Sequence, residues 1–173
     1  MSRLIESIKL VDGKFYNMAF HEKRMRRSLI ALFGLTEPVD LEKLLNEGNF
    51  PSSGLFKCRI LYDANSREIS FEPYHPRRIE RVKVVEDNNI SYPFKFVDRT
   101  PINRLFALRG VCDDVMIIRN GRVTDCSFSN VVFRKGREWF TPDTPLLEGT
   151  MRGMLIAENK IAVREILRED IRS

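Results

Sequence analysis

The chain has 173 residues, of which 43% are hydrophobic and 31% charged, as in an ordinary soluble globular protein. No apolar run is long enough to span a membrane, and the N-terminus lacks the apolar core of a signal peptide. The net charge of +5 and the pI near 9.3 permit an acidic partner, but neither an aromatic-interleaved RNA motif nor zinc-finger spacing supports nucleic-acid binding.

The cysteines and histidines argue against a metal site. Cys58, Cys112 and Cys126 are odd in number and widely spaced, which fits neither a disulfide framework nor a zinc site. Only two histidines are present, so we expect no metal site. Cysteines without a disulfide framework fit a reducing compartment, so we expect the protein in the cytoplasm. Basic residues cluster at His21–Arg27 and His75–Lys83, which we interpret as a solvated helix face and a charged edge strand.

The first half is predicted to be rich in strands and to carry one long helix. Turn residues, capping residues and apolar periodicity predict the following elements: a hairpin of 5–10 and 14–18, a helix over 20–33 ended by Gly34, a short helix over 41–46 capped by Asp40, a hairpin of 55–62 and 68–72, and a strand over 78–85. The polar run Glu86–Asn89 is the predicted link, giving an N-terminal α+β domain over 1–86 and a C-terminal α+β domain over 91–173.

The second half is predicted to mix helices with a mostly antiparallel sheet. Thr100 can cap a helix that has Pro101 at its first position and runs to about Arg109. A further helix is expected over 151–158 and a last strand over 163–167. The fold class is therefore α+β.

The stretch DDVMIIRNGRVTDCSFSNVVFRKGREWFTP, residues 113–142, carries the clearest functional signal. Strands are predicted at 115–118, 122–125, 130–133 and 138–140, with Asn120-Gly121 as a type I′ turn. Between the second and third strands, an acid and small polar or thiol side chains interrupt the sheet at DCSFSN. Packing alone does not require these residues there, so this segment predicts a site.

Four features could carry chemistry, and each has a simpler structural explanation. Lys95 lies between aromatic residues, where its amine could be activated, although its stem could merely pack beside them. Asp125 could cap a turn, and Arg27 could be one more solvated base of a helix. Gly149-Thr150 could be a helix start only. No histidine lies near Cys126 in sequence, which favours a buried thiol over a nucleophile.

Taken together, these groups are those that pyridoxal 5'-phosphate needs. Its aldehyde requires a lysine, its ring nitrogen requires a carboxylate, and its phosphate requires a guanidinium and the backbone N–H groups of a helix start. The sequence contains no G-x-S-x-G elbow, no H-E-x-x-H and no Walker phosphate loop, so hydrolase and nucleotide chemistry lack support.

The chain resembles the class IV aminotransferases, the fold-type IV pyridoxal phosphate enzymes. The resemblance runs from about Ile5 to about Ile171 and is most specific in residues 113–142 and in TPLLEGTMR. It implies a two-domain architecture, with a small N-terminal α/β domain and a C-terminal mixed barrel-like domain, and a homodimer. These enzymes include branched-chain and D-amino acid aminotransferases and aminodeoxychorismate lyase.

The resemblance also implies roles for individual residues. Lys95 matches the Schiff-base lysine, Asp125 the acid facing the pyridine nitrogen, although the family usually has Glu there, and Arg27 the phosphate-binding arginine. The remaining cofactor contacts would come from Ser127, Phe128, Ser129, Gly149 and Thr150. The implied activity is an aminotransferase acting on an amino acid and a 2-oxo acid; a lyase of the aminodeoxychorismate type and a non-catalytic member of the fold stay open as alternatives.

Overall fold

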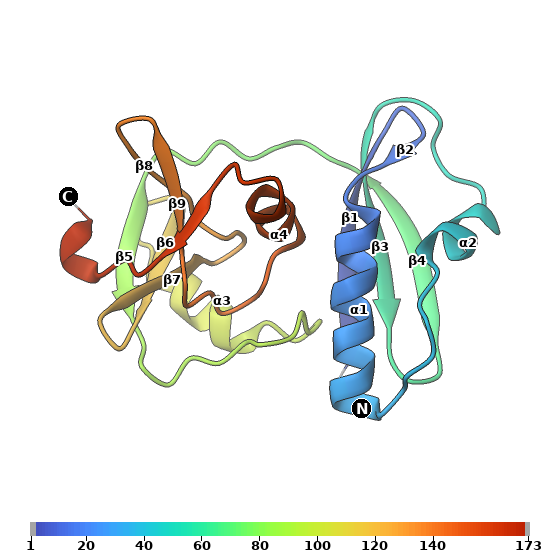
Figure 1. The fold of residues 1–173 in the computed structure, drawn as a ribbon, viewed down its shortest axis with the longest axis horizontal. Coiled ribbons are helices and arrows are strands. Elements are labelled where there is room, and N and C mark those ends of the chain that lie inside the picture. The colour runs from blue at the N-terminus through green and yellow to red at the C-terminus, as the bar shows by residue number, and fades with distance from the viewer. Residues whose placement is uncertain (1–2, 172–173) are drawn as a thin grey trace. The chain divides into compact units, whose positions relative to one another are not determined.

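The structure is a computed structural model that describes residues 3–171 (Figure 1). Its elements, in chain order, are β1 (Leu4–Val11), β2 (Lys14–Phe15), α1 (Met18–Phe33), α2 (Leu41–Asn46), β3 (Leu55–Tyr62), β4 (Arg67–Pro73), β5 (Val82–Glu86), α3 (Thr100–Ala107), β6 (Asp114–Arg119), β7 (Arg122–Cys126), β8 (Phe133–Lys135), β9 (Glu138–Pro142), α4 (Thr150–Ala157), β10 (Ala162–Arg164) and the 3₁₀ turn η1 (Arg168–Asp170). They form two compact units. The first comprises the chain up to Arg77 with Phe94–Asp98, and the second comprises Arg78–Pro93 with the chain from Arg99 onward.

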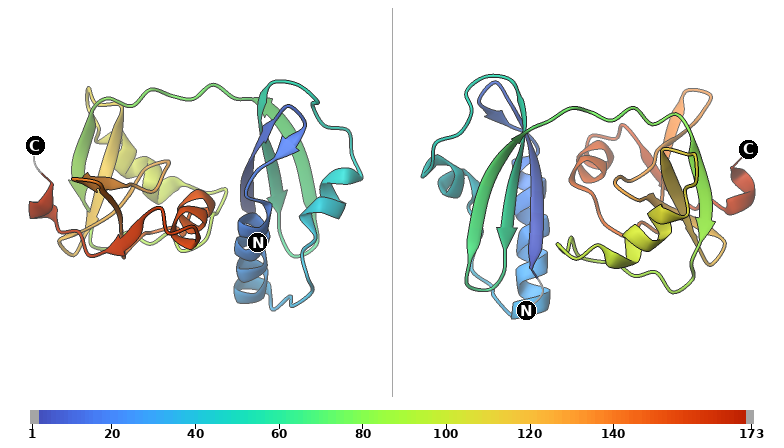
Figure 2. Two further views of the ribbon diagram at one scale, coloured as in Figure 1. Left: turned by 45° about the horizontal axis from the view of Figure 1, so that its top comes forward. Right: turned by 180° about the vertical axis from the view of Figure 1, so that it is seen from behind.

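The first unit is a four-stranded antiparallel sheet with helix α1 against one face (Figure 2). The strand order is β2-β1-β3-β4, and β1 pairs with β3 in continuous register along its whole length. Alternating strand residues and one stripe of α1 enclose the core, which contains Leu4, Ile8, Met25, Leu29 and Ile60. The hairpin predicted over 55–62 and 68–72 and the long helix are confirmed. In the first hairpin the strand expected over 14–18 is limited to Lys14–Phe15, because α1 already begins at Met18.

Local turn and stop signals were reliable in this unit. Asp12 and Gly13 have φ of 46° and 76°, as a tight hairpin turn requires. Helix α1 ends at Gly34, whose φ is 69° and whose N–H donates to the Ile30 carbonyl at 3.0 Å. Glycine adopts this left-handed conformation without the steric cost that a Cβ would bring.

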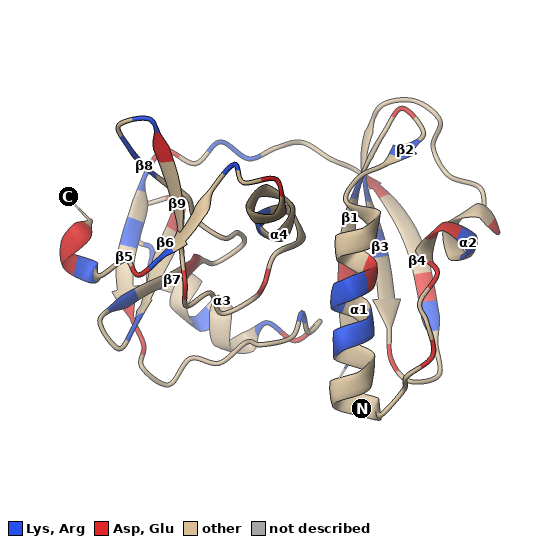
Figure 3. Cartoon of the chain, in the orientation of Figure 1, with Lys and Arg blue, Asp and Glu red and all other residues tan. Residues whose placement is uncertain are grey.

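Some residues of α1 are buried or exposed where the sequence predicted the opposite. Lys23 and Arg26 are exposed, and basic residues gather in the middle of α1 (Figure 3). His21 and Arg24, however, are buried at 2% and 8% exposure, so the basic cluster is not simply a solvated face. Ile30, an apolar residue of the same helix, is 42% exposed. Periodicity alone placed Arg24 wrongly because a buried acid on a neighbouring strand attracts it, as described below.

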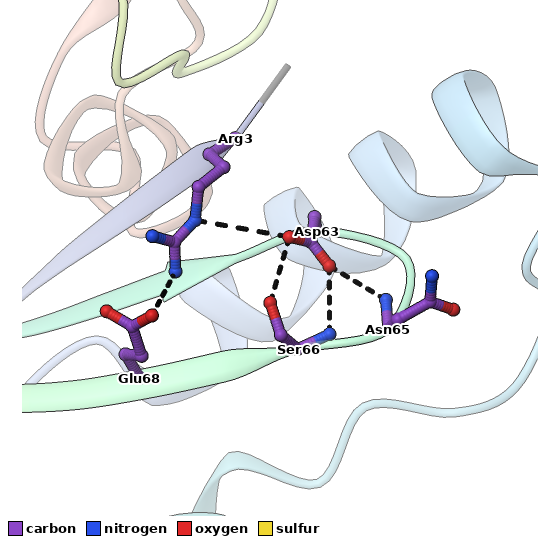
Figure 4. A network of polar contacts seen from close by, with 5 residues as sticks. All are labelled: Arg3, Asp63, Asn65, Ser66 and Glu68. Carbon is purple, nitrogen blue, oxygen red and sulfur yellow. Dashed lines mark hydrogen bonds and ion pairs between the residues drawn. The ribbon is translucent and has the colours of Figure 1, made fainter. Parts of the chain in front are cut away.

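The turn between β3 and β4 is closed by a small polar network (Figure 4). Asp63 Oδ1 accepts hydrogen bonds from the backbone N–H groups of Asn65 and Ser66, both at 2.8 Å. Asp63 Oδ2 accepts the Ser66 hydroxyl at 2.8 Å and faces Arg3 Nε at 4.0 Å. Arg3 also pairs with Glu68 at 2.8 Å, so the turn ties the start of β1 to the β3–β4 hairpin.

Asp40 caps the six-residue helix α2, as predicted, with its Oδ1 accepting the Lys43 backbone N–H at 2.8 Å. We expect Asp40→Ala to lower the free energy of unfolding by about 1 kcal/mol, because one N–H at the helix start loses its acceptor. Urea unfolding together with hydrogen exchange of the α2 amides measures this effect. The exposed Glu37 makes no cap, so Glu37→Ala is the matched control and should leave both observables unchanged.

The second unit contains two three-stranded sheets and the helices α3 and α4. In one sheet β6 lies between β5, which is parallel to it, and β7, which is antiparallel. In the other, β9 lies between the parallel β10 and the antiparallel β8. A core cluster of Ile118, Val123 and Ile166 is joined by Phe133 and Phe140. The Asn120-Gly121 hairpin is confirmed, with φ of 52° and 73°.

Several predictions for this region need correction. The strand expected over 78–85 begins only at Val82 and pairs with β6, and the strand expected over 130–133 begins at Phe133. Thr100 is the first residue of α3 rather than its cap. The polar run 86–89, expected as a link, lies inside the second unit, where Asp87 donates its N–H to the Ile118 carbonyl.

Together the three sheets and four α-helices confirm the α+β class among the described residues. The barrel-like form of the C-terminal half stays a prediction. Within residues 3–171, no helix combines the length and apolar character needed to cross a membrane.

Candidate functional site

Asp125 is positioned by a tight reversal of the chain at the end of β7. The turn 126–129 is closed by the Cys126 N–H, which donates to the Ser129 carbonyl at 2.8 Å. As a result Asp125 and Asn130 face one another as an antiparallel bridge. The polar segment DCSFSN therefore forms this turn, and Asp125 is the residue immediately before it.

The carboxylate of Asp125 is buried, at 5% exposure, and accepts three hydrogen bonds. Asn130 Nδ2 donates to Oδ1 at 2.6 Å, while the N–H groups of Leu146 and Leu147 donate to Oδ2 at 2.8 and 3.0 Å. Burial raises the pKa of Asp125 to about 6, and the hydrogen bonds offset only part of that rise. Since each carboxylate oxygen has two lone pairs, one acceptor position is left on Oδ1.

The loop after the acid presents one aromatic ring and turns one serine inward. Ser127 is 3% exposed, and its hydroxyl donates to the carboxylate of Asp114. The Phe128 ring is half exposed, lies edge-on to Phe106 with centroids 5.3 Å apart, and carries the Arg99 guanidinium 4.3 Å above its centroid. Arg99 also donates to the Ser127 carbonyl, so it holds this loop from the start of α3.

Helix α4 begins beside the acid. Gly149 precedes its first residue, Thr150, and supplies no side-chain cap. The segment before it is tied to Asp125 through Leu146 and Leu147, while Arg152 donates to the Pro142 carbonyl at 2.8 Å. The N-terminal end of a helix carries partial positive charge from its aligned peptide dipoles, which favours an anion there. The two predicted features, Asp125 and Gly149-Thr150, are thus brought together.

Lys95 and Arg27 both lie in the first unit. The Lys95 carbonyl accepts the Ile5 N–H at 2.9 Å, and Leu4 and Phe96 form an antiparallel bridge, so this segment runs along β1. Lys95 and Arg27 are both partly buried, and the Arg27 guanidinium carbon lies 5.8 Å from the centroid of the Phe94 ring. The two aromatic neighbours of Lys95 in the sequence, Phe94 and Phe96, have ring centroids 6.0 Å apart.

A buried polar cluster in the first unit was not predicted. Glu6 on β1 is fully buried and accepts His21 Nδ1 at 2.6 Å and Arg24 Nη2 at 2.5 Å on Oε2, and Arg24 Nε at 3.0 Å on Oε1. Burial by itself would raise the pKa of Glu6, but the hydrogen bonds and charges of His21 and Arg24 outweigh it and lower the pKa. The available signal was an acid between Leu4 and Ile8, which lie two residues away on the same face of the strand.

The described residues contain no group of three or more His, Cys, Asp or Glu side chains that could hold a metal. The groups of the second unit, a carboxylate with one acceptor position left and a helix start, suit an organic anion that also has an N–H donor. This set has the chemistry that the resemblance implies for pyridoxal phosphate. Burial and the nearby Asp114 and Asp125 raise the pKa of the Cys126 thiol to about 12, which disfavours its thiolate form at neutral pH.

Known proteins resemble this chain in sequence and in fold. The family described as amino-transferase class IV matches residues 3–173. An uncharacterized protein of Haemophilus influenzae is 41% identical over 174 residues, covering 99% of this chain and 92% of its own length. A crystal structure from Haemophilus somnus, of a protein provisionally named 4-amino-4-deoxychorismate lyase, is 38% identical with a TM-score of 0.92, covering 98% of this chain and 90% of that one. An aminotransferase from Brucella abortus, solved with its cofactor PLP, shares the fold at 20% identity and a TM-score of 0.73, covering 97% of this chain and 73% of that one.

Proposed function

Because the chain belongs to the class IV aminotransferase family, we propose that it is a pyridoxal phosphate enzyme that moves an amino group between an amino acid and a 2-oxo acid. The observation that carries this proposal is the buried Asp125 carboxylate, held next to the start of α4 with one acceptor position left. A carboxylate and a helix start so close together suit a ligand that has a basic ring nitrogen and a phosphate.

Each proposed residue has one task. Lys95 would hold the cofactor through its amine, and the same Nζ would take the proton from the substrate Cα. Oδ1 of Asp125 would keep a proton on the ring nitrogen, while Arg27 and the Gly149-Thr150 helix start would bind the phosphate. Pyridoxal phosphate, when bound, supplies an electron sink for the bonds at Cα. The Ser127–Ser129 loop would lie along the ring, and a homodimer is part of the proposal.

A lyase of the aminodeoxychorismate type is the second candidate. It is favoured by the similarity to the Haemophilus somnus protein, at 38% identity over 98% of this chain. The two candidates differ in their products. Incubation of the PLP-loaded protein with aminodeoxychorismate should release pyruvate without an amino acceptor if it is a lyase. If it is a transferase, amino acids should instead yield 2-oxo acids beyond one equivalent per protein only in the presence of an acceptor.

Lys95→Ala is expected to abolish covalent attachment of the cofactor. Incubation with pyridoxal phosphate followed by borohydride should fix one cofactor on Lys95 of the unaltered protein, as peptide mass spectrometry would show, and none on the variant. Lys57 is the matched control, because it is another partly buried lysine of the first unit and lies 5.8 Å from the centroid of the Tyr74 ring. Lys57→Ala should leave the labelling intact.

Two other outcomes would change the proposal. Labelling of a different lysine would show that Lys95 is misassigned while the chemistry is retained. No labelling of any lysine, and no absorbance band from bound cofactor, would favour a non-catalytic member of the family.

A further inference from the structure

The side chain of Asn130 lies between the two parts of the candidate site in the second unit. Its Nδ2 donates one hydrogen to Asp125 Oδ1 at 2.6 Å and the other to the Leu147 carbonyl at 2.8 Å. Both N–H bonds of the amide are therefore used. One of them reaches the acid at the end of β7, and the other reaches the segment that leads into α4.

Gly149 is in contact with the same amide from the other side. A Cβ added at Gly149 would lie 1.9 Å from Asn130 Oδ1 and 3.1 Å from its Cγ. The backbone of Gly149, at φ −71° and ψ 144°, is open to every residue type, so backbone strain does not explain a glycine there. What the position lacks is room for a side chain, because the Asn130 amide occupies that room.

We propose that Asn130 is a positioning residue whose carboxamide holds the Asp125 carboxylate and the start of α4 as one rigid unit, and that Gly149 is small in order to admit it. This rests on the proposed function insofar as Asp125 and the helix start are taken to bind one ligand. The contacts themselves are properties of the ligand-free protein and can be tested in it.

The chemistry of the position limits what can replace the asparagine. Alanine or leucine removes both donors and leaves the Leu147 carbonyl and one oxygen of Asp125 without this partner. Aspartate removes the donors and adds a second negative charge against Asp125. Each of these changes withdraws a hydrogen bond that favours the charged form of Asp125, so each should raise the pKa of that acid.

A double-mutant cycle on the ligand-free protein tests the proposal. The proteins are the unaltered chain, Asn130→Ala, Gly149→Ala and the combined variant, and the pKa of Asp125 is followed through its ¹³C carboxyl resonance. Asn130→Ala should raise that pKa by about one unit, as the loss of one hydrogen bond to a charged group implies. Gly149→Ala, which removes no hydrogen-bonding group from the protein, should raise it similarly because the new Cβ displaces the Asn130 amide from Asp125.

The combined variant gives the sharpest outcome. With the amide already absent, the added Cβ meets nothing at 1.9 Å, so the combined pKa should equal that of Asn130→Ala alone instead of showing two added shifts. Gly48→Ala is the control: Gly48 has no atom within 4 Å of an added Cβ, and the pKa of Asp125 should not move. Asn130→Ser, which keeps one donor, covers the case in which Asn130→Ala fails to fold and should give a smaller rise.

The opposite results would overturn the inference. An unchanged pKa of Asp125 in Asn130→Ala would show that Asn130 only packs beside the acid. A pKa that rises in Asn130→Ala but not in Gly149→Ala would show that the size of residue 149 does not matter for the position of the amide. Fully additive shifts would show that the two residues act separately. None of these readouts involves pyridoxal phosphate, so failure of the Lys95 labelling would not affect them, and failure here would leave the labelling test standing.

Discussion

Glu6→Gln is expected to lower the free energy of unfolding of the first unit by about 3–5 kcal/mol, although it removes only one charge from a side chain of nearly unchanged shape. Glu6 is fully buried, and Arg24, only 8% exposed, makes two hydrogen bonds to it. Without the carboxylate, the guanidinium is left as a buried charge whose desolvation is no longer offset by a counter-charge.

The measurement must separate the two units. Trp139 is the only tryptophan of the chain and lies on β9, so its fluorescence follows the second unit. Hydrogen exchange of the amides of β1 and β3 follows the first. Glu6→Gln should accelerate exchange in these strands and leave the tryptophan transition in urea unchanged.

Two comparison variants sharpen the test. Glu72 pairs with Lys57 and Arg59 at the surface, with 42% of its side chain exposed, so Glu72→Gln should cost only about 0–1 kcal/mol. The apolar combination Glu6→Leu, His21→Leu and Arg24→Met should recover most of the loss, because it removes the buried charges together. A cost for Glu6→Gln no greater than that for Glu72→Gln would refute this account.

The features of the fold that sequence predicted correctly are those decided by local chemistry. Asn120-Gly121 formed its turn because its two residues adopt positive φ, and Gly34 ended α1 in the left-handed region. Asp40 capped α2 because its side chain needs to reach only three residues along the chain. In such cases the partner is near in sequence, so the pattern contains the whole interaction.

The predictions that failed depend on partners far along the chain. Strand β5 pairs in parallel with β6, about thirty residues later, and nothing local to 82–86 specifies that neighbour. Arg24 was placed on the solvent side because helical periodicity treats every arginine as polar. Its burial depends on Glu6, which lies on a different element.

The candidate site shows the same division. Asp125 was identified from its interruption of a sheet, and Gly149-Thr150 from a helix start, both of which are local signals. The hydrogen bonds from the backbone N–H groups of Leu146 and Leu147 to the Asp125 carboxylate could not be predicted. Nearly every residue type has a backbone N–H, so the sequence does not indicate which of them will bind a distant acid. Asn130 was predicted only as a strand residue, whereas its amide joins the two features.

The pH dependence of the second unit is expected to oppose ordinary acid denaturation. Burial raises the pKa of Asp125 from 3.8 to about 6, so the folded state holds a proton that the unfolded chain has already released between these pH values. The contribution of Asp125 to stability is therefore fully present below pH 4 and is lost as the pH rises through 6. The difference amounts to about 3 kcal/mol, since one pKa unit corresponds to about 1.4 kcal/mol.

Asp125→Asn removes the titration and provides the reference. The free energy of unfolding, from urea titrations followed by Trp139 fluorescence, should fall by about 3 kcal/mol from pH 4 to pH 7 in the unaltered protein relative to the variant. Glu6, whose pKa is lowered, acts in the opposite direction but in the first unit, and the comparison cancels it. A difference between the two proteins that does not change with pH would contradict the raised pKa. A confirmed pKa near 6 would in turn mean that Asp125 is ionised only above that pH, so a ligand whose ring N–H it accepts should bind more weakly as the solution is acidified.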